Sequence, residues 1–281
     1  MKSKLSGILL LFFCLTSVYA QDKLTWMVLN WPPWMIINDA DQEKGRFNHI
    51  LSVAKKSLSE YEHITEEMNW ARFWHEVEDG RDICYIFGVK TRKRQDLVYY
   101  SLPHTFLLPN EIIIKKTDLK KFGNPESISI VTLLKDKRIK GYAEKKRSFT
   151  EDIDNILKKI EVGSNLERIA EHTESIIRMI ITDRIDYTIE YPIVASYYEK
   201  KNKYFGVLTS IPITEMKPFT YVYMNCTKNE WGKKVIERWN EELQKIKPTD
   251  DYRRITEMGH TDKDELQKIR QYYDEFVNAK N

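Results

Sequence analysis

The sequence has few of the residue patterns that mark catalytic and metal centres. Its 281 residues include only three cysteines and six histidines. No HExxH, CxxC, GxSxG or glycine-rich phosphate loop occurs in it, and no two histidines have the spacing of a metal pair. We therefore expect no cofactor, no metal and no catalytic residue, and we interpret the histidines as surface or supporting residues.

Long apolar runs and a one-sided charge are also missing. After residue 20 no stretch approaches the roughly eighteen consecutive apolar residues that can span a membrane. The formal net charge is +3, and without Lys2 and Lys4 it is 3 − 2 = +1, so we expect no nucleic-acid partner. The apolar content of 42% is enough for a core, and the length suits one large domain or two lobes.

The first 20 residues have the pattern of a secretory signal peptide. Lys2 and Lys4 form a basic start, residues 7–15 are an apolar run too short to cross a bilayer, and a small-x-Ala site ends at Ala20. We expect cleavage after Ala20, which would release a soluble mature chain beginning at Gln21 into the periplasm.

Two cysteines, Cys84 and Cys226, remain after such a cleavage. An oxidising, exported compartment permits a disulfide between them. Two separate, buried, apolar side chains are the alternative. The sequence leaves both possibilities open.

The first hundred residues of the mature chain alternate between strand and helix patterns. Apolar, β-prone runs cover residues 24–30, 64–69 and 83–87, while residues 47–58 and 72–78 have helical spacing. Helices between strands indicate parallel pairing with right-handed crossovers. The pattern therefore predicts an α/β fold.

Two polar, proline-containing connectors, 116–127 and 211–217, bound a central segment that repeats this alternation. A late strand and charged helices follow the second connector. We therefore predict two α/β lobes joined by two crossings, with a ligand pocket between them and hinge closure. The expected division is a signal peptide (1–20), the first part of lobe 1 (21–115), lobe 2 (116–213), and the completion of lobe 1 with C-terminal helices (214–281).

The stretch 82–101 is the strongest candidate for a binding site. Its buried strand opens into a loop with four cations, Lys90, Arg92, Lys93 and Arg94. Positive charge at the carboxyl end of a strand in an open α/β sheet is typical of an anion site. A solvated charge run is the alternative.

Several motifs of the chain, in the order in which they occur, resemble those of the family 3 extracellular solute-binding proteins. These proteins are the periplasmic receptors of polar amino-acid ABC importers. Thr91 and Arg94 with the following VYYSLP match that family's TxxR…FSxPY signature. The further matches are Pro32-Pro33 after the first strand, WARFW at 70–74, RIDY at 184–187 and WGKK at 231–234.

The resemblance implies the type II periplasmic-binding-protein fold, with two lobes and two hinge crossings. It also implies a monomeric, non-enzymatic protein that captures a small carboxylate-bearing ligand, an amino acid or a related compound, for an ABC permease. A ligand sensor for a membrane signalling partner is one alternative. An enzyme similar to the cyclohexadienyl dehydratases, with Glu190 as its general acid, is another.

The resemblance also assigns roles to individual residues. It implies that Arg94 binds the ligand carboxylate, which suits the planar fork of a guanidinium. Trp31 and Trp70 are candidate aromatic walls, with core packing as the alternative. Ser148 and Thr150 precede a helix, where they can contact an anion or only cap the helix.

One expected residue is missing from the pattern. The position whose acidic side chain would hold a ligand ammonium falls at Tyr191, one residue after Glu190. Glu190 would serve only with a register shift of one, which would turn its side chain to the other face of the strand. Tyr191 together with Trp31 favours a more aromatic or less cationic ligand.

Overall fold

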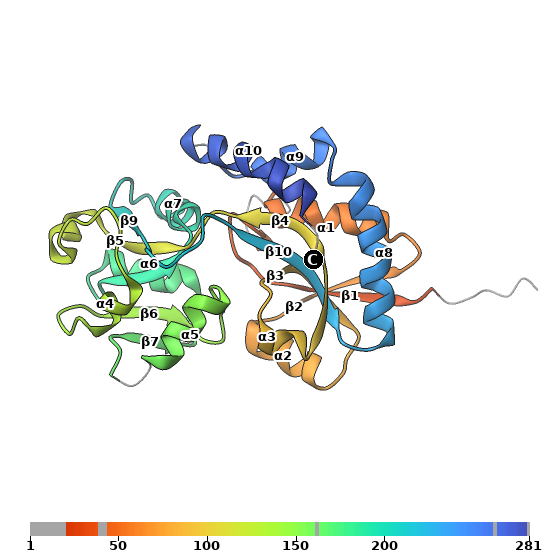
Figure 1. Ribbon diagram of the computed structural model, residues 1–281. Helices are drawn as coiled ribbons and strands as arrows, with labels where there is room; N and C mark the ends of the chain where they lie inside the picture. Colours follow the sequence, from red (N-terminus) through yellow and green to blue (C-terminus); the bar gives the residue numbers. More distant parts are fainter. Residues whose placement is uncertain (1–20, 39–43, 161–162, 261–262, 280–281) are drawn as a thin grey trace, which may run out of the picture.

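The computed structural model describes residues 21–38, 44–160, 163–260 and 263–279, and these form two α/β lobes (Figure 1). The predicted signal peptide lies outside the described residues. Each lobe contains one five-stranded sheet. In the first lobe the order is β2 (Glu62–Glu67), β1 (Lys23–Val28), β3 (Ile83–Gly88), β10 (Thr220–Thr227) and β4 (Val98–Leu107).

The first three strands of lobe 1 are joined by helices, as the alternation of the sequence predicts. β1 pairs in parallel with β2 and β3, while β10 runs antiparallel between β3 and β4. α1 (Arg46–Ser57) buries Phe47, Ile50 and Ala54, and α2 (Trp70–Glu78) starts at an Asn69 cap. The short α3 (Arg92–Gln95) follows β3.

The second lobe is one continuous part of the chain. Its sheet has the order β7 (Leu166–Ile169), β6 (Gly141–Glu144), β8 (Tyr187–Glu190), β5 (Glu111–Lys115) and β9 (Leu208–Pro212). Its helical segments are η1 (Lys116–Phe122), α4 (Ile130–Lys135), α5 (Glu151–Lys159), α6 (Thr173–Ile181) and α7 (Pro192–Lys201).

The strand Glu111–Lys115 corrects the predicted lobe boundary. The sequence analysis placed it in lobe 1, but β5 pairs with β8 and β9 in the second sheet. The chain therefore crosses between the lobes at residues 108–110, before β5, and returns at residues 213–219. The predicted connector at 116–127 instead begins with the 3-10 helix of lobe 2.

Three helices complete lobe 1 after β10. α8 (Glu230–Ile246) packs against β4 and β10, and α9 (Asp250–Glu257) packs against α1. α10 (Lys263–Asn278) packs on α9 and on β4, and all three lie along the lobe 1 side in Figure 1. Among the described residues, no helix has the length and apolar character needed to cross a membrane.

Cys84 and Cys226 are joined by a disulfide between β3 and β10, across 142 positions of sequence. Both residues are fully buried. The bond therefore ties β10, which follows lobe 2 in the chain, to β3, one of the strands that precede it.

Of the histidines expected at surface or supporting positions, His104 lies in the core of lobe 1. It is fully buried, and its Nε2 lies 2.6 Å from the backbone oxygen of Ile86. Burial disfavours the charged imidazole and lowers the pKa of His104 from 6.5 to about 3.

The folded state should therefore lose stability as the pH falls. Below pH 6.5 the unfolded chain binds a proton at His104 that the folded chain does not bind until about pH 3. Between pH 7 and pH 5 this difference costs about 2 kcal/mol. In urea titrations, His104→Gln should reduce the loss of stability over this range by about that amount. Substituting His75, which is 73% exposed, should leave the loss unchanged, and equal effects would contradict the assignment.

Candidate functional site

The two sheets direct the carboxyl ends of their parallel strands toward the boundary between the lobes. Trp31 follows β1 and Arg94 follows β3, while Arg147 follows β6 and Tyr191 follows β8. In open α/β sheets ligands bind outside the carboxyl ends of the strands. The chain order therefore assembles one site from segments that are distant in sequence.

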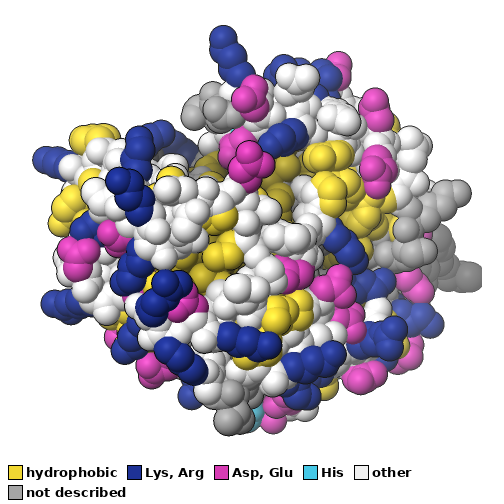
Figure 2. Space-filling model, turned by 60° about the vertical axis from the view of Figure 1, so that its left-hand side comes forward, with side chains coloured by type: hydrophobic (Ala, Val, Ile, Leu, Met, Phe, Trp, Pro, Cys, Tyr) yellow, Lys and Arg dark blue, Asp and Glu magenta, His cyan; other side chains and the backbone are white. Residues whose placement is uncertain are grey.

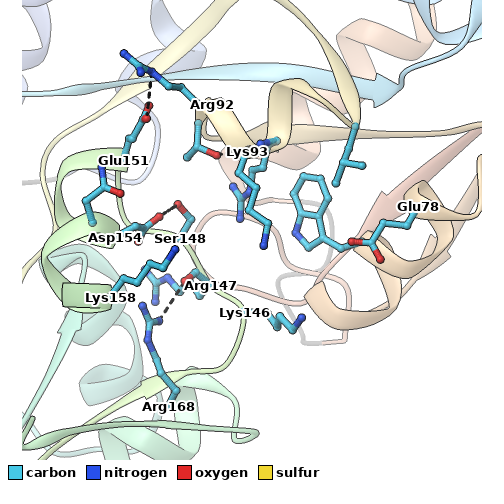
Figure 3. Close-up of a pocket in the computed structure, with 15 residues that line it drawn as sticks. Glu78, Arg92, Lys93, Lys146, Arg147, Ser148, Glu151, Asp154, Lys158 and Arg168 are labelled. Atoms are coloured by element: carbon cyan, nitrogen blue, oxygen red, sulfur yellow. Dashed lines mark hydrogen bonds and ion pairs between the residues drawn. The ribbon is translucent and has the colours of Figure 1, made fainter. Parts of the chain in front are cut away.

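A cavity of about 540 Å³ lies between the lobes at this boundary (Figure 3). Lobe 1 contributes α2 and α3, and lobe 2 contributes the loop before α5, α5 itself and β7. The charged residues that line the cavity are Arg92, Lys93, Arg94, Lys146, Arg147, Lys158, Arg168, Glu78, Glu151 and Asp154. Cations thus outnumber carboxylates by seven to three in this lining.

Arg94 lines the cavity from lobe 1, as the sequence analysis expected. Thr91 caps α3 by accepting a hydrogen bond from the Arg94 amide. The Arg94 side chain donates to the Val89 carbonyl oxygen at 3.2 Å, and its guanidinium lies 4.7 Å from the Trp74 ring centroid. Burial lowers the pKa of Arg94. No carboxylate in the described part of the chain forms an ion pair with it.

Arg147 lies at the centre of the boundary, although the sequence analysis gave it no role in binding. Its guanidinium donates two hydrogen bonds, of 2.5 and 2.6 Å, to the Glu190 carboxylate and a third to Asn110 at 3.1 Å. It also lies 4.7 Å from the Trp31 ring, which belongs to lobe 1. Burial is the largest single effect and favours the neutral form, but the charge and hydrogen bonds of Glu190, together with Tyr191 and Glu144, raise the pKa of Arg147.

Glu190 and Tyr191 are both buried at the end of β8. Besides the pair with Arg147, Glu190 accepts hydrogen bonds from the Tyr191 amide at 2.8 Å and the Thr173 hydroxyl at 3.2 Å. Glu190 is therefore a buried, fully engaged carboxylate at the end of β8. Burial raises the pKa of the Tyr191 phenol to about 12, so the ring is neutral.

The candidate aromatic walls separate into two groups. Trp31 contacts Tyr191 across the lobes, with ring centroids 5.9 Å apart, and Trp34 does the same at 5.7 Å. Trp70 is buried against Tyr85 within lobe 1. Neither Trp31 nor Trp70 lines the cavity, but Trp31 reaches the boundary between the lobes. Trp70 thus follows the core-packing alternative. Trp74 supplies an aromatic wall that the sequence analysis did not single out.

Ser148 and Thr150 organise the start of α5. Thr150 caps the helix by accepting from the Ile153 amide at 3.3 Å. The Ser148 hydroxyl bonds to Asp154, which also accepts from the Phe149 amide at 3.0 Å. Ser148 lines the main cavity, whereas Thr150 lines a second cavity of about 620 Å³ near the 213–219 crossing.

Positive charge is concentrated at the cavity and not over the whole surface. Figure 3 shows Lys93, Lys146 and Lys158 reaching toward the cavity from separate elements. On the face drawn in Figure 2, Lys and Arg side chains are mixed with Asp and Glu. Among the described residues no group of His, Cys, Asp and Glu could hold a metal ion. The arrangement suits a small anion.

No family model and no curated protein matches the chain. An amino-acid ABC transporter substrate-binding protein from Streptococcus pneumoniae, bound to L-arginine, is similar with a TM-score of 0.65 and 19% identity, over 89% of this chain and 96% of that one. A structure from a study of glutathione import and the cystine ABC importer of Streptococcus mutans has a TM-score of 0.65 and 16% identity, over 84% and 94%.

A histidine kinase sensor domain with similarity to periplasmic binding proteins is also similar, with a TM-score of 0.65 and 13% identity over 84% of this chain and 94% of that one. At these identities the similarity concerns the fold. Together with the strand orders of the two sheets, it confirms the predicted two-lobed periplasmic-binding-protein fold.

Proposed function

We propose that the chain is a solute-binding protein, related to the family 3 extracellular proteins, that captures a small carboxylate-bearing ligand between its lobes. The observation that carries the proposal is Arg94, a half-buried guanidinium that lines the interlobe cavity without a carboxylate partner in the described chain. Arginines that are partly withdrawn from water are usually paired. An anionic ligand would supply the missing partner of Arg94.

The chemistry of Arg94 supports this proposal. A guanidinium presents parallel N–H donors that match a carboxylate, and such a bond is stronger where water is excluded. The cavity of about 540 Å³ lies within the range of small-molecule sites. Because its walls come from both lobes, ligand binding would favour the closed arrangement of the lobes.

The proposed partner is an ABC permease, served by a monomeric protein in the periplasm. Solved structures of the same fold include ABC transporter substrate-binding proteins. A membrane sensor is a second candidate, because the fold also occurs in a histidine kinase sensor domain. Co-purification from detergent-solubilised membranes would distinguish a permease from a kinase as the bound partner.

We propose binding without catalysis. The enzyme alternative required Glu190 to act as a general acid. In the structure Glu190 accepts a bidentate ion pair from Arg147, and a carboxylate in that arrangement accepts hydrogen bonds instead of supplying a proton. Turnover of a prephenate-like compound would contradict this proposal.

A thermal-shift screen over small carboxylates and amino acids tests the proposed function. A ligand at 100 times its dissociation constant adds about 2.7 kcal/mol to the free energy of unfolding, which is a readily measured rise in melting temperature. Mass spectrometry of molecules retained through purification would identify a candidate independently. If no carboxylate in either experiment binds, the proposal fails.

Arg94→Lys should weaken carboxylate binding by about 2 kcal/mol, or about thirtyfold. Lysine keeps the charge but loses the planar pair of donors. Isothermal titration calorimetry measures the change in affinity. Arg72→Lys is the control, because Arg72 lies on α2 with its side chain 54% exposed and does not line the cavity. Equal affinities of the wild type and Arg94→Lys would refute the role of Arg94.

A further inference from the structure

We infer that the Arg147 guanidinium fills the position between the lobes where the ammonium group of a ligand would otherwise bind. The solute is therefore an organic anion without an amino group. This inference rests on the proposed function and narrows its ligand class. Small mono- and dicarboxylates fit it, whereas α-amino acids do not.

The surroundings of the Arg147 guanidinium have the composition of a cation-binding cage. Three aromatic rings lie near it, those of Trp31 at 4.7 Å, Phe149 at 5.1 Å and Tyr191 at 5.8 Å from the guanidinium carbon. The Glu190 carboxylate closes the cage with two hydrogen bonds. Aromatic faces with a carboxylate are the usual protein environment for an organic cation. Here the cation is part of the chain.

The cage also spans the two lobes. Trp31 belongs to lobe 1, whereas Arg147, Glu190 and Tyr191 belong to lobe 2. A solute cation that used this cage would have to lie between the same surfaces. Because Arg147 already lies there, a ligand ammonium would have to displace it.

The chain holds Arg147 firmly in this position. Arg168 donates hydrogen bonds of 3.1 Å to the carbonyl oxygens of Glu144 and Arg147, which fixes the loop between β6 and α5. The Arg147 side chain is only 5% exposed and the Glu190 side chain 1% exposed. Withdrawing Arg147 would leave the Glu190 charge buried and unpaired, which is strongly unfavourable.

Two of the three carboxylates that line the cavity are already engaged, and the third, Glu78, lies exposed at the end of α2. Glu151 pairs with Arg92 at 3.6 Å, and Asp154 accepts from Ser148 and from the Phe149 amide. Glu144 is close enough to Arg147 to raise its pKa but does not line the cavity.

Arg92 and Arg147 are already paired, but two other cations of the lining are available. Neither Arg94 nor Lys158 forms an ion pair within the described chain. An entering carboxylate therefore meets available positive charge, whereas an entering ammonium meets like charge.

The test compares ligands that differ by one amino group. The pairs are succinate and aspartate, glutarate and glutamate, and 3-phenylpropionate and phenylalanine, each titrated calorimetrically into the full chain. In the pair that contains the tightest-binding compound, we expect the compound without the amino group to bind with at least tenfold higher affinity than the amino acid. An amino acid that binds as tightly as its partner compound, or more tightly, would overturn the inference.

A second experiment tests whether the cage around Arg147 binds a cation. Arg147→Ala opens the cage, so methylguanidinium should raise the melting temperature of the variant above that in sodium chloride of equal ionic strength. It should not do so for the wild type or for Lys145→Ala, an exposed cation on the same loop. In Arg147→Ala the ratio of the two affinities within each ligand pair should also change at least tenfold in favour of the amino acid.

The two arms separate the failure of this inference from the failure of the proposed function. If no anion binds the wild type but methylguanidinium stabilises Arg147→Ala, the proposed function fails and the assignment of the cage stands. If amino acids bind the wild type and methylguanidinium has no effect on the variant, the inference is overturned and solute binding stands. If Arg147→Ala does not fold, Arg147→Gln provides the neutral variant for the ligand pairs.

Discussion

Loss of the disulfide between Cys84 and Cys226 should lower the free energy of unfolding by about 3 to 5 kcal/mol. The bond closes a loop of 142 positions, for which the chain-entropy relation gives about 5 kcal/mol at 25 °C. Measured effects are commonly about 2 to 4 kcal/mol. The loop contains the whole of lobe 2, so the bond limits how far β3 and β10 separate in the unfolded chain.

Urea unfolding with and without a reductant measures this effect. The double variant Cys84→Ala with Cys226→Ala is the control, and its unfolding midpoint should not respond to the reductant. Both cysteines are fully buried, so the variant also reports the packing lost with the two sulfur atoms. A wild-type chain that is equally stable with and without reductant would show that the cross-link does not stabilise the fold.

Breaking the pair between Arg147 and Glu190 should cost a similar amount, about 3 to 5 kcal/mol. Arg147→Met leaves a buried carboxylate without its partner, and Glu190→Met leaves a buried guanidinium. Replacing both residues removes both charges, and well-packed apolar substitutes of a buried pair are often neutral or stabilising. The double variant should therefore be more stable than either single variant.

Equilibrium unfolding of the four proteins gives the coupling energy between the two residues. The pair Lys115 and Asp183 is a suitable control, because it is an ion pair in lobe 2 whose Asp183 side chain is 68% exposed. Its loss should cost no more than about 1 kcal/mol. If the loss of stability in the double variant equalled the sum of the losses in the two single variants, the charges of Arg147 and Glu190 would not interact.

The sequence predicted the parts of the site that local patterns describe. The buried strand and the cationic turn marked the stretch 82–101, and the resemblance to the solute-binding signature then singled out Arg94 among its four cations. The early strands and helices were predictable for the same reason, since hydrophobic period and helix caps are local properties.

The remaining features depend on contacts between distant segments. Arg147 and Glu190 are 43 positions apart, and no spacing rule relates a loop arginine to a carboxylate at the end of a later strand. Trp31 and Trp70 have similar sequence contexts, but only Trp31 reaches the boundary between the lobes. The place of β5 in the second sheet depends on its partners β8 and β9, which the sequence of β5 does not contain.

The position of β10 in the first sheet has a consequence for the order of folding. β4 is attached to that sheet only through β10, so as the chain grows from its N-terminus β4 has no strand partner until residues 220–227 have been made. Lobe 2 is complete before then, because its strands all lie between residues 111 and 212. Since lobes generally fold as units, the second lobe should fold before the first. The unpaired edges of β3 and β4 would be the surface exposed to chaperones or to aggregation in the meantime.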